Sequence, residues 1–153
     1  MNNIQTNTRD QDSLEYILQL ELDNIRLFLE LLEHERNLLA AGNLDDLALL
    51  VADKDRLINQ FARLDMRRNR FLNAAGLPEG AQGMNAWVSG SAEESTVARD
   101  WEELLGLADL AKQLNQTNAV ITSSWLQYTR RTLNALHSAA GHPPLYNTKG
   151  QTT

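Results

Sequence analysis

The chain has 153 residues, with 14 Lys and Arg against 20 Asp and Glu, so its formal net charge is −6. This length favours one ordinary domain, and 42% hydrophobic residues with 22% charged residues is a globular composition. The absence of Cys excludes disulfide frameworks, thiolate nucleophiles and Cys-based metal sites. No apolar run approaches the roughly 18 residues of a membrane helix, and residues 1–13 lack the regions of a secretory signal. We therefore expect a soluble, acidic, cytoplasmic protein with no membrane insertion.

The composition predicts an all-α fold. Only 8 Gly and 3 Pro occur, while residues that favour helices dominate. We predict an elongated antiparallel helical bundle of three long helices, with a loop or short helix between the second and third. The bundle occupies residues 12–141, with helices at about 12–41, 44–75 and 92–140. Residues 1–11 are expected to be disordered, and residues 142–153 to form an extended tail.

The first predicted helix begins at Asp12, an acidic N-cap with Glu15 three residues later. Its apolar residues recur at helical spacing and form a wide stripe that a bundle helix can bury. Gly42 ends the helix because it can adopt the left-handed conformation, and Asn43 can cap the next helix at once. So short a joint requires the two helices to run antiparallel.

The second predicted helix runs from Leu44 to about Ala75, where Gly76 and Pro78 stop it. Residues 77–91 are rich in Gly, which predicts a loop with one helical turn around Met84–Val88. Trp87 is expected to dock onto the core, because a large aromatic side chain in a loop usually does so.

The third predicted helix begins with a capping box at residues 91–94 and lasts to Ala140. At about 1.5 Å per residue it would span roughly 73 Å, more than either of the other helices. We therefore expect it to extend beyond them, to break, or to do both. Gln113–Ser124 is its weakest stretch because Asn, Thr and Ser concentrate there. Its seam alternates steps of three and four residues, as in a coiled coil: Leu104, Leu107, Ala111, Leu114, Asn118, Ile121, Trp125 and Tyr128.

Motifs for catalysis and for cofactors are missing. The sequence has no P-loop, no dinucleotide-binding Gly pattern and no nucleophile elbow. None of the three His has the Glu three residues earlier that a di-iron bundle needs. We predict no enzyme activity, no cofactor and no metal site.

Basic residues concentrate in residues 54–70, where Arg63, Arg67 and Arg70 share one face. A nucleic-acid-binding protein could use that face together with Arg130 and Arg131. No aromatic residues interleave with it, however, and in an antiparallel hairpin it lies opposite the acidic first helix. We favour ion pairing between the two helices and expect no nucleic-acid partner.

Two segments resemble motifs of the FlgN family of flagellar export chaperones. Residues 114–118 (LNQTN) match its Leu-Asn-x-x-Asn motif, and residues 145–152 (LYNTKGQT) match its C-terminal Leu-Tyr-x-x-x-Gly-Gln-Thr. Leu49–Leu57 is similar to the leucine-rich segment of the family, and Arg67–Leu72 to the Arg-rich end that follows it. The resemblance covers roughly residues 14–152.

The resemblance implies a cytoplasmic chaperone for the two hook-filament junction proteins, which are hook-associated proteins of the flagellum. Such a chaperone holds their aggregation-prone C-terminal helical segments, prevents premature assembly and escorts them to the type III export gate. It implies the cytoplasmic domain of that gate as a second partner, and the export ATPase complex as a further candidate.

A client helix needs an apolar groove, which the latter half of the third helix can offer. The predicted client-binding residues are Asn115, Asn118, Ile121, Trp125, Tyr128, Leu133 and Leu136. The same stripe can equally belong to the intramolecular core. Asn118 can also fix the register of a helix pair, as buried Asn does in coiled coils.

Two successive prolines favour an extended segment after the third helix. We predict that Leu145, Tyr146 and Gly150 in this tail contact the export gate. Docking of the tail back onto the bundle is the alternative. The competing interpretation of the whole chain is a structural homodimeric coiled-coil protein, in which the third helix pairs with its twin.

Overall fold

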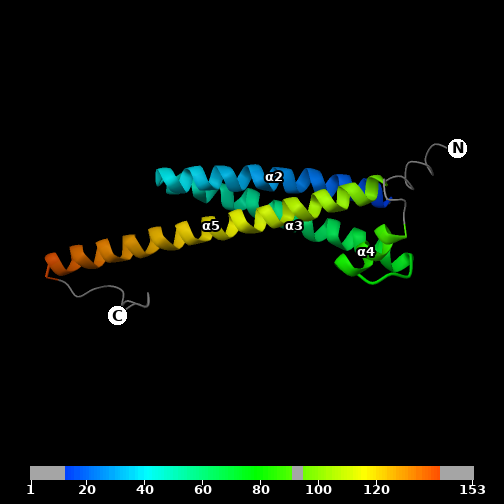
Figure 1. The fold of residues 1–153 in the computed structure, drawn as a ribbon. Helices are drawn as coiled ribbons and strands as arrows, with labels where there is room; N and C mark the ends of the chain where they lie inside the picture. Colours follow the sequence, from blue (N-terminus) through cyan, green and yellow to red (C-terminus); the bar gives the residue numbers. More distant parts are fainter. Residues whose placement is uncertain (1–12, 91–94, 142–153) are drawn as a thin grey trace. The chain divides into compact units, whose positions relative to one another are not determined.

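The computed structural model describes residues 13–90 and 95–141. These residues form four helices: α2 (Leu14–Ala41), α3 (Leu44–Ala74), α4 (Gly80–Ser89) and α5 (Thr96–Ala139) (Figure 1). The described ranges contain no strand, so the predicted all-α class is confirmed. The chain divides into two compact units, residues 1–114 (the first unit) and residues 115–153 (the second unit).

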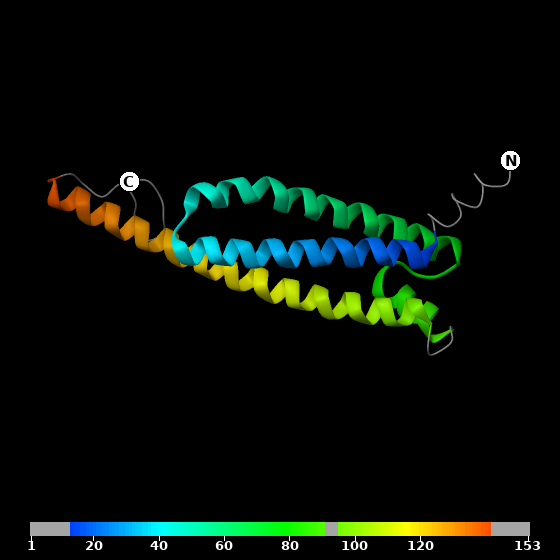
Figure 2. The same cartoon turned by 90° about the horizontal axis from the view of Figure 1, so that it is seen from above.

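Helices α2 and α3 of the first unit lie side by side as an antiparallel hairpin (Figure 2). Gly42 has a φ of 67°, and the side chain of Asn43 accepts a hydrogen bond from the Asp46 N–H at 3.2 Å. The predicted joint is therefore confirmed. The predicted N-cap of α2 is wrong, because the Ser13 hydroxyl accepts the Tyr16 N–H at 3.2 Å, while Asp12 lies outside the described residues.

Helix α4 has ten residues, which is longer than the single predicted turn. A side chain at Gly83 would place its Cβ 1.7 Å from the carbonyl oxygen of Pro78, so the glycine lets the two backbones approach closely. The Trp87 ring meets Phe71 edge to face, with centroids 5.0 Å apart. The docking of Trp87 is thus confirmed, and these tertiary contacts explain a helix that local propensity alone did not favour.

Helix α5 is continuous from Thr96 to Ala139, so a break, which is one of the expected alternatives, is not found within it. Ser95 caps its start, since the Ser95 hydroxyl accepts the Ala98 N–H at 3.2 Å. The predicted capping box at residues 91–94 lies outside the described residues. At the other end Gly141 has a φ of 79°, the left-handed conformation that terminates helices.

The core of the first unit takes residues from all four helices. Within it, Phe28 and Phe61 pack edge to face across α2 and α3, with ring centroids 5.3 Å apart. The buried members of the core are Leu14, Leu18, Leu22, Ile25, Phe28, Leu31, Leu32, Leu57, Leu72, Met84, Val97, Trp101, Leu104 and Ala111. Residues 96–114 of α5 therefore contribute to the same core as α2 and α3.

Polar contacts also join the helices of the first unit. The Gln19 amide donates to Asp100 at 2.7 Å, and Arg26 pairs with Glu103 at 2.7 Å, which ties α2 to the start of α5. The expected pairing of the basic stretch in α3 with the acidic first helix is seen in Lys54, which lies 3.2 Å from Glu35. None of the described helices carries an apolar stretch long enough to cross a bilayer.

Candidate functional site

The second unit contains a polar stretch that nevertheless stays helical. Hydroxyl groups here bond to the backbone carbonyl one turn earlier, for example Thr122 to Asn118 at 2.9 Å and Thr129 to Trp125 at 2.9 Å. Ser124 and Thr132 bond in the same way. Side-chain hydroxyls that could have drawn the backbone out of the helix are thereby satisfied inside it.

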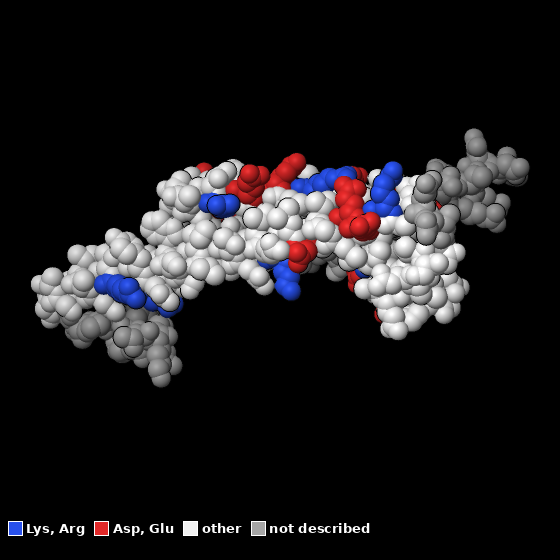
Figure 3. All heavy atoms as spheres, in the orientation of Figure 1, with Lys and Arg blue, Asp and Glu red and all other residues white. Residues whose placement is uncertain are grey.

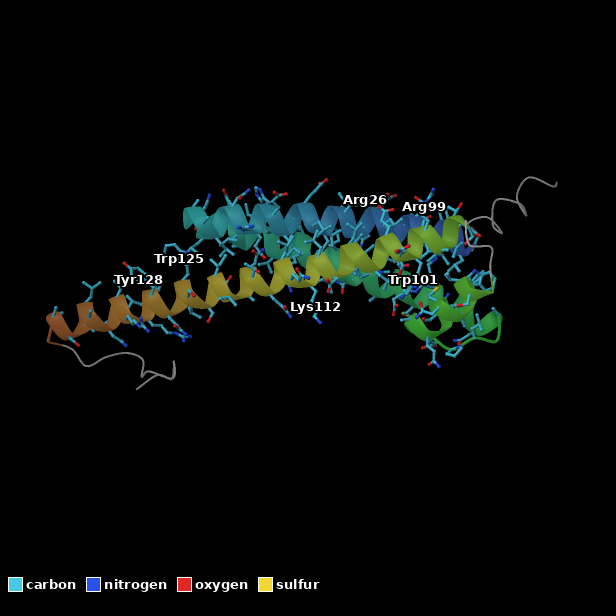
Figure 4. All side chains as sticks on the ribbon, viewed as in Figure 1. Arg26, Arg99, Trp101, Lys112, Trp125 and Tyr128 are labelled. Carbon is cyan, nitrogen blue, oxygen red and sulfur yellow. The ribbon has the colours of Figure 1, made fainter. Side chains whose placement is uncertain are left out.

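A shallow apolar groove lies on this part of α5. It has a volume of about 430 Å³ and is lined by Val120, Ile121, Ser124, Trp125 and Tyr128. Trp125 and Tyr128 lie near each other on the helix (Figure 4), and their rings meet edge to face with centroids 6.1 Å apart. The rings are one turn apart, so they form one wall of aromatic surface.

Large apolar side chains of the second unit are unusually exposed. Tyr128 is 64% exposed and Val120 is 66% exposed, values typical of polar surface residues. We call the set the exposed α5 surface: Val120, Ile121, Trp125, Leu126, Tyr128, Leu133 and Leu136. Ile121 is its one half-buried member. Exposed apolar side chains gathered on one helix in this way are more typical of a protein-binding site than of a solvated face.

The structure brings three of the predicted client-binding residues, Ile121, Trp125 and Tyr128, into one groove. Leu133 and Leu136 are exposed farther along the helix and do not line that groove. The two asparagines differ, since Asn118 is buried at 2% exposure whereas Asn115 is exposed. The predicted gate-binding residues Leu145, Tyr146 and Gly150 lie outside the described residues.

Sequence analysis missed Val120, Ser124 and Leu126. Val120 and Ser124 are four residues apart, so helical spacing alone would have placed them on one face beside the seam. Leu126 would have been found by widening the seam from a narrow coiled-coil stripe to a broad apolar face.

A second feature is a buried charge cluster in the first unit. Arg68 on α3 donates hydrogen bonds to Glu21 on α2 and to Asp65, and its guanidinium lies 5.2 Å from the ring centroid of Trp101 on α5. Burial raises the pKa of Glu21, and this desolvation outweighs the opposing attraction of Arg68. Arg68 and its partners therefore connect three helices at one level.

A groove of about 410 Å³ opens beside this cluster, with Ile25, Phe61, Leu104 and Leu105 among its apolar walls. The Arg68 guanidinium pairs with both carboxylates of the cluster, and within the described ranges no group of three His, Asp or Glu could hold a metal ion. The cluster offers neither a nucleophile with a base nor a metal site, so its arrangement fits a structural role.

Comparison with known families gives one result. The model of the family described as FlgN protein matches residues 10–153 of the chain. Searches of curated proteins and of solved structures each gave no match. The matched range includes every described helix and the whole exposed α5 surface.

Proposed function

The chain belongs to the FlgN family of flagellar export chaperones, and we propose that it binds the C-terminal helical segments of the hook-filament junction proteins. It acts in the cytoplasm, where it keeps these hook-associated proteins from assembling prematurely. It then delivers them to the export gate. This is a binding function with no catalytic step.

The exposed α5 surface is the observation that carries the proposal. A client helix that buries its apolar stripe on assembly exposes that stripe to water before assembly. A chaperone with a matching apolar face can cover the stripe during that time. The groove lined by Trp125 and Tyr128 supplies aromatic anchors of the type that dominate binding energy at interfaces. Leu133 and Leu136 extend the contact along the helix.

In this proposal, residues 142–153 take part in delivering the client to the export gate. Leu145 and Tyr146 are apolar residues in an otherwise polar segment, and the family motif includes both together with Gly150. Tyr146 fills a pocket of the gate's cytoplasmic domain, while its hydroxyl finds a polar partner. The export ATPase complex is a further candidate partner at this stage.

We also infer that α2, α3 and residues 96–114 of α5 act as an antiparallel three-helix bundle in solution. The shared core and the ion pairs from Arg26 and Arg68 support this inference. The bundle holds the first part of α5 in place, which leaves the second unit to carry the client-binding residues.

A structural homodimer is the second candidate function, since the same exposed surface could bind a second copy of the chain. The two candidates differ in stoichiometry. Size-exclusion chromatography with light scattering on the full chain, alone and with a synthetic C-terminal segment of a junction protein, separates them. We expect a one-to-one complex with the segment. A dimer that persists and ignores the segment would favour the structural candidate.

A further inference from the structure

The charges of the chain are divided unevenly between its two units. All 20 Asp and Glu lie within residues 1–114. Residues 115–153 contain Arg130, Arg131 and Lys149 but no carboxylate side chain. Figure 3 shows both colours over the first unit and only blue, from Lys and Arg, on the second. The second unit is thus a locally positive part of an acidic protein.

Arg130 and Arg131 lie at the edges of the exposed α5 surface. Arg131 follows Tyr128 by one turn, and Arg130 follows Leu126 by one turn, so each is a neighbour of an exposed apolar residue. Consecutive residues of a helix point about 100° apart, so Arg131 lies on the Tyr128 side of this surface and Arg130 on the Leu126 side. Among the described residues, no carboxylate pairs with either arginine.

The positive charge of the second unit and the two arginines beside the exposed α5 surface indicate the chemistry of the helix that binds there. Resting on the function proposed above, we propose that the helix bound by the exposed α5 surface carries acidic residues along both edges of its apolar stripe. Such a helix places its apolar residues in the groove and its carboxylates beside Arg130 and Arg131, as flanking charges do in coiled coils. The first unit is acidic overall, so its net charge favours the second unit for the same helix.

An acidic helix fits better than the other polyanions that arginines attract. Binding to anionic lipids from a surface patch generally uses clusters of about four to eight Lys and Arg, whereas α5 offers two beside its groove. Nucleic acid would need a row of phosphate contacts. The 430 Å³ apolar groove, which lies just before the two arginines on α5, has no use in either case.

The test uses the full chain and two synthetic helical peptides with identical Leu stripes, one with Glu at the flanking positions and one with Gln. Calorimetric titration in 50 mM NaCl should show the Glu peptide binding about tenfold more tightly than its Gln twin. The difference should shrink in 500 mM NaCl, because salt screens exposed pairs.

A charge exchange identifies the residues responsible. Arg130→Glu with Arg131→Glu should reverse the preference, so that a third peptide with Lys at the flanks binds most tightly. The matched control, Arg56→Glu with Arg63→Glu on α3, makes the same charge change in the first unit and should leave the preference for Glu. Circular dichroism verifies that both double variants keep their helices.

The outcomes separate this inference from the function on which it rests. Equal binding of the Glu and Gln peptides to the wild-type chain would overturn the acidic-helix inference and leave the chaperone function standing. Failure of all three peptides and of the junction-protein segment would overturn both. Arginine-dependent binding to anionic vesicles or single-stranded RNA, without peptide binding, would overturn the inference in favour of that polyanion.

Discussion

Trp125 and Tyr128 meet edge to face on α5, with ring planes at 87° and centroids 6.1 Å apart, although both side chains are exposed. Such a pair contributes about 0.5–1.5 kcal/mol beyond simple burial when it is packed in a core. On the surface of a helix it restricts the rotamers of both rings. The two rings are therefore oriented before a partner arrives, which lowers the entropy cost of binding.

Substitution at Gly83 tests the packing that positions α4. Gly83→Ala should lower the free energy of unfolding by about 1–3 kcal/mol, since its Cβ would meet the backbone oxygen of Pro78. The matched control is Gly106→Ala in α5, where the new Cβ would meet no atom within 4 Å apart from its own neighbours in the helix. That change should stabilise the chain by about 1 kcal/mol, from helix propensity. Urea denaturation measures the free energy of unfolding of both variants. Equal changes at the two sites would contradict the close approach of Gly83 to Pro78.

The buried Glu21 predicts a pH dependence with a definite sign. Burial raises the pKa of Glu21 above the ordinary value of a glutamate, so the folded chain holds this proton more tightly than the unfolded chain. The contribution of protonated Glu21 to the free energy of unfolding is fully present below its pKa in the unfolded chain. It is lost as pH rises through its pKa in the folded chain. Glu21→Gln cannot titrate at this position.

Urea denaturation at pH 4 and at pH 7 measures the effect. The free energy of unfolding of Glu21→Gln, relative to wild type, should be higher at pH 7 than at pH 4. A relative stability that stays constant or falls between these two pH values would show that Arg68 outweighs burial at Glu21.

The fold could be predicted largely because its signals are local. Gly42 and Asn43 define the joint between α2 and α3 through backbone conformation and capping, both of which depend on a few neighbouring residues. Helix α4 was less predictable, because its length depends on Gly83 meeting Pro78 and on Trp87 meeting Phe71. Those contacts join residues that only the folded chain brings together.

The candidate site also has features that the sequence could predict and features that it could not. Ile121, Trp125 and Tyr128 could be predicted from helical spacing, whereas their exposure could not, since a seam residue can be core or surface. The burial of Asn118 shows the difference within one seam. The contact between Glu21 and Arg68 was also missed as a specific pair, because their alignment depends on the register of two helices.

Tyr146 provides a test of delivery that leaves client binding untouched. Tyr146→Ala should weaken binding to the cytoplasmic domain of the export gate and reduce export of the junction proteins. Client affinity and melting temperature should stay at wild-type values. Tyr16→Ala, which removes an exposed tyrosine from the first unit, serves as the control. A Tyr146→Ala protein that melts earlier and binds client weakly, with gate affinity intact, would show that the tail is structural.

The central claim is that the exposed α5 surface binds the client, and the affinity of Trp125→Ala for a junction-protein C-terminal segment tests it most directly. Removing an anchoring aromatic typically costs about 2 kcal/mol, so we predict a dissociation constant about 30-fold higher, with Leu133→Ala acting in the same direction. Both variants should melt close to wild type.

The comparison is Leu32→Ala, which removes a fully buried core side chain and should cost about 2–5 kcal/mol of stability. The folded fraction of that variant should bind the segment with wild-type affinity. If instead Trp125→Ala, Leu133→Ala and Leu32→Ala lose stability alike, and the folded fraction of each binds the segment normally, Trp125 and Leu133 belong to the core and the client binds elsewhere.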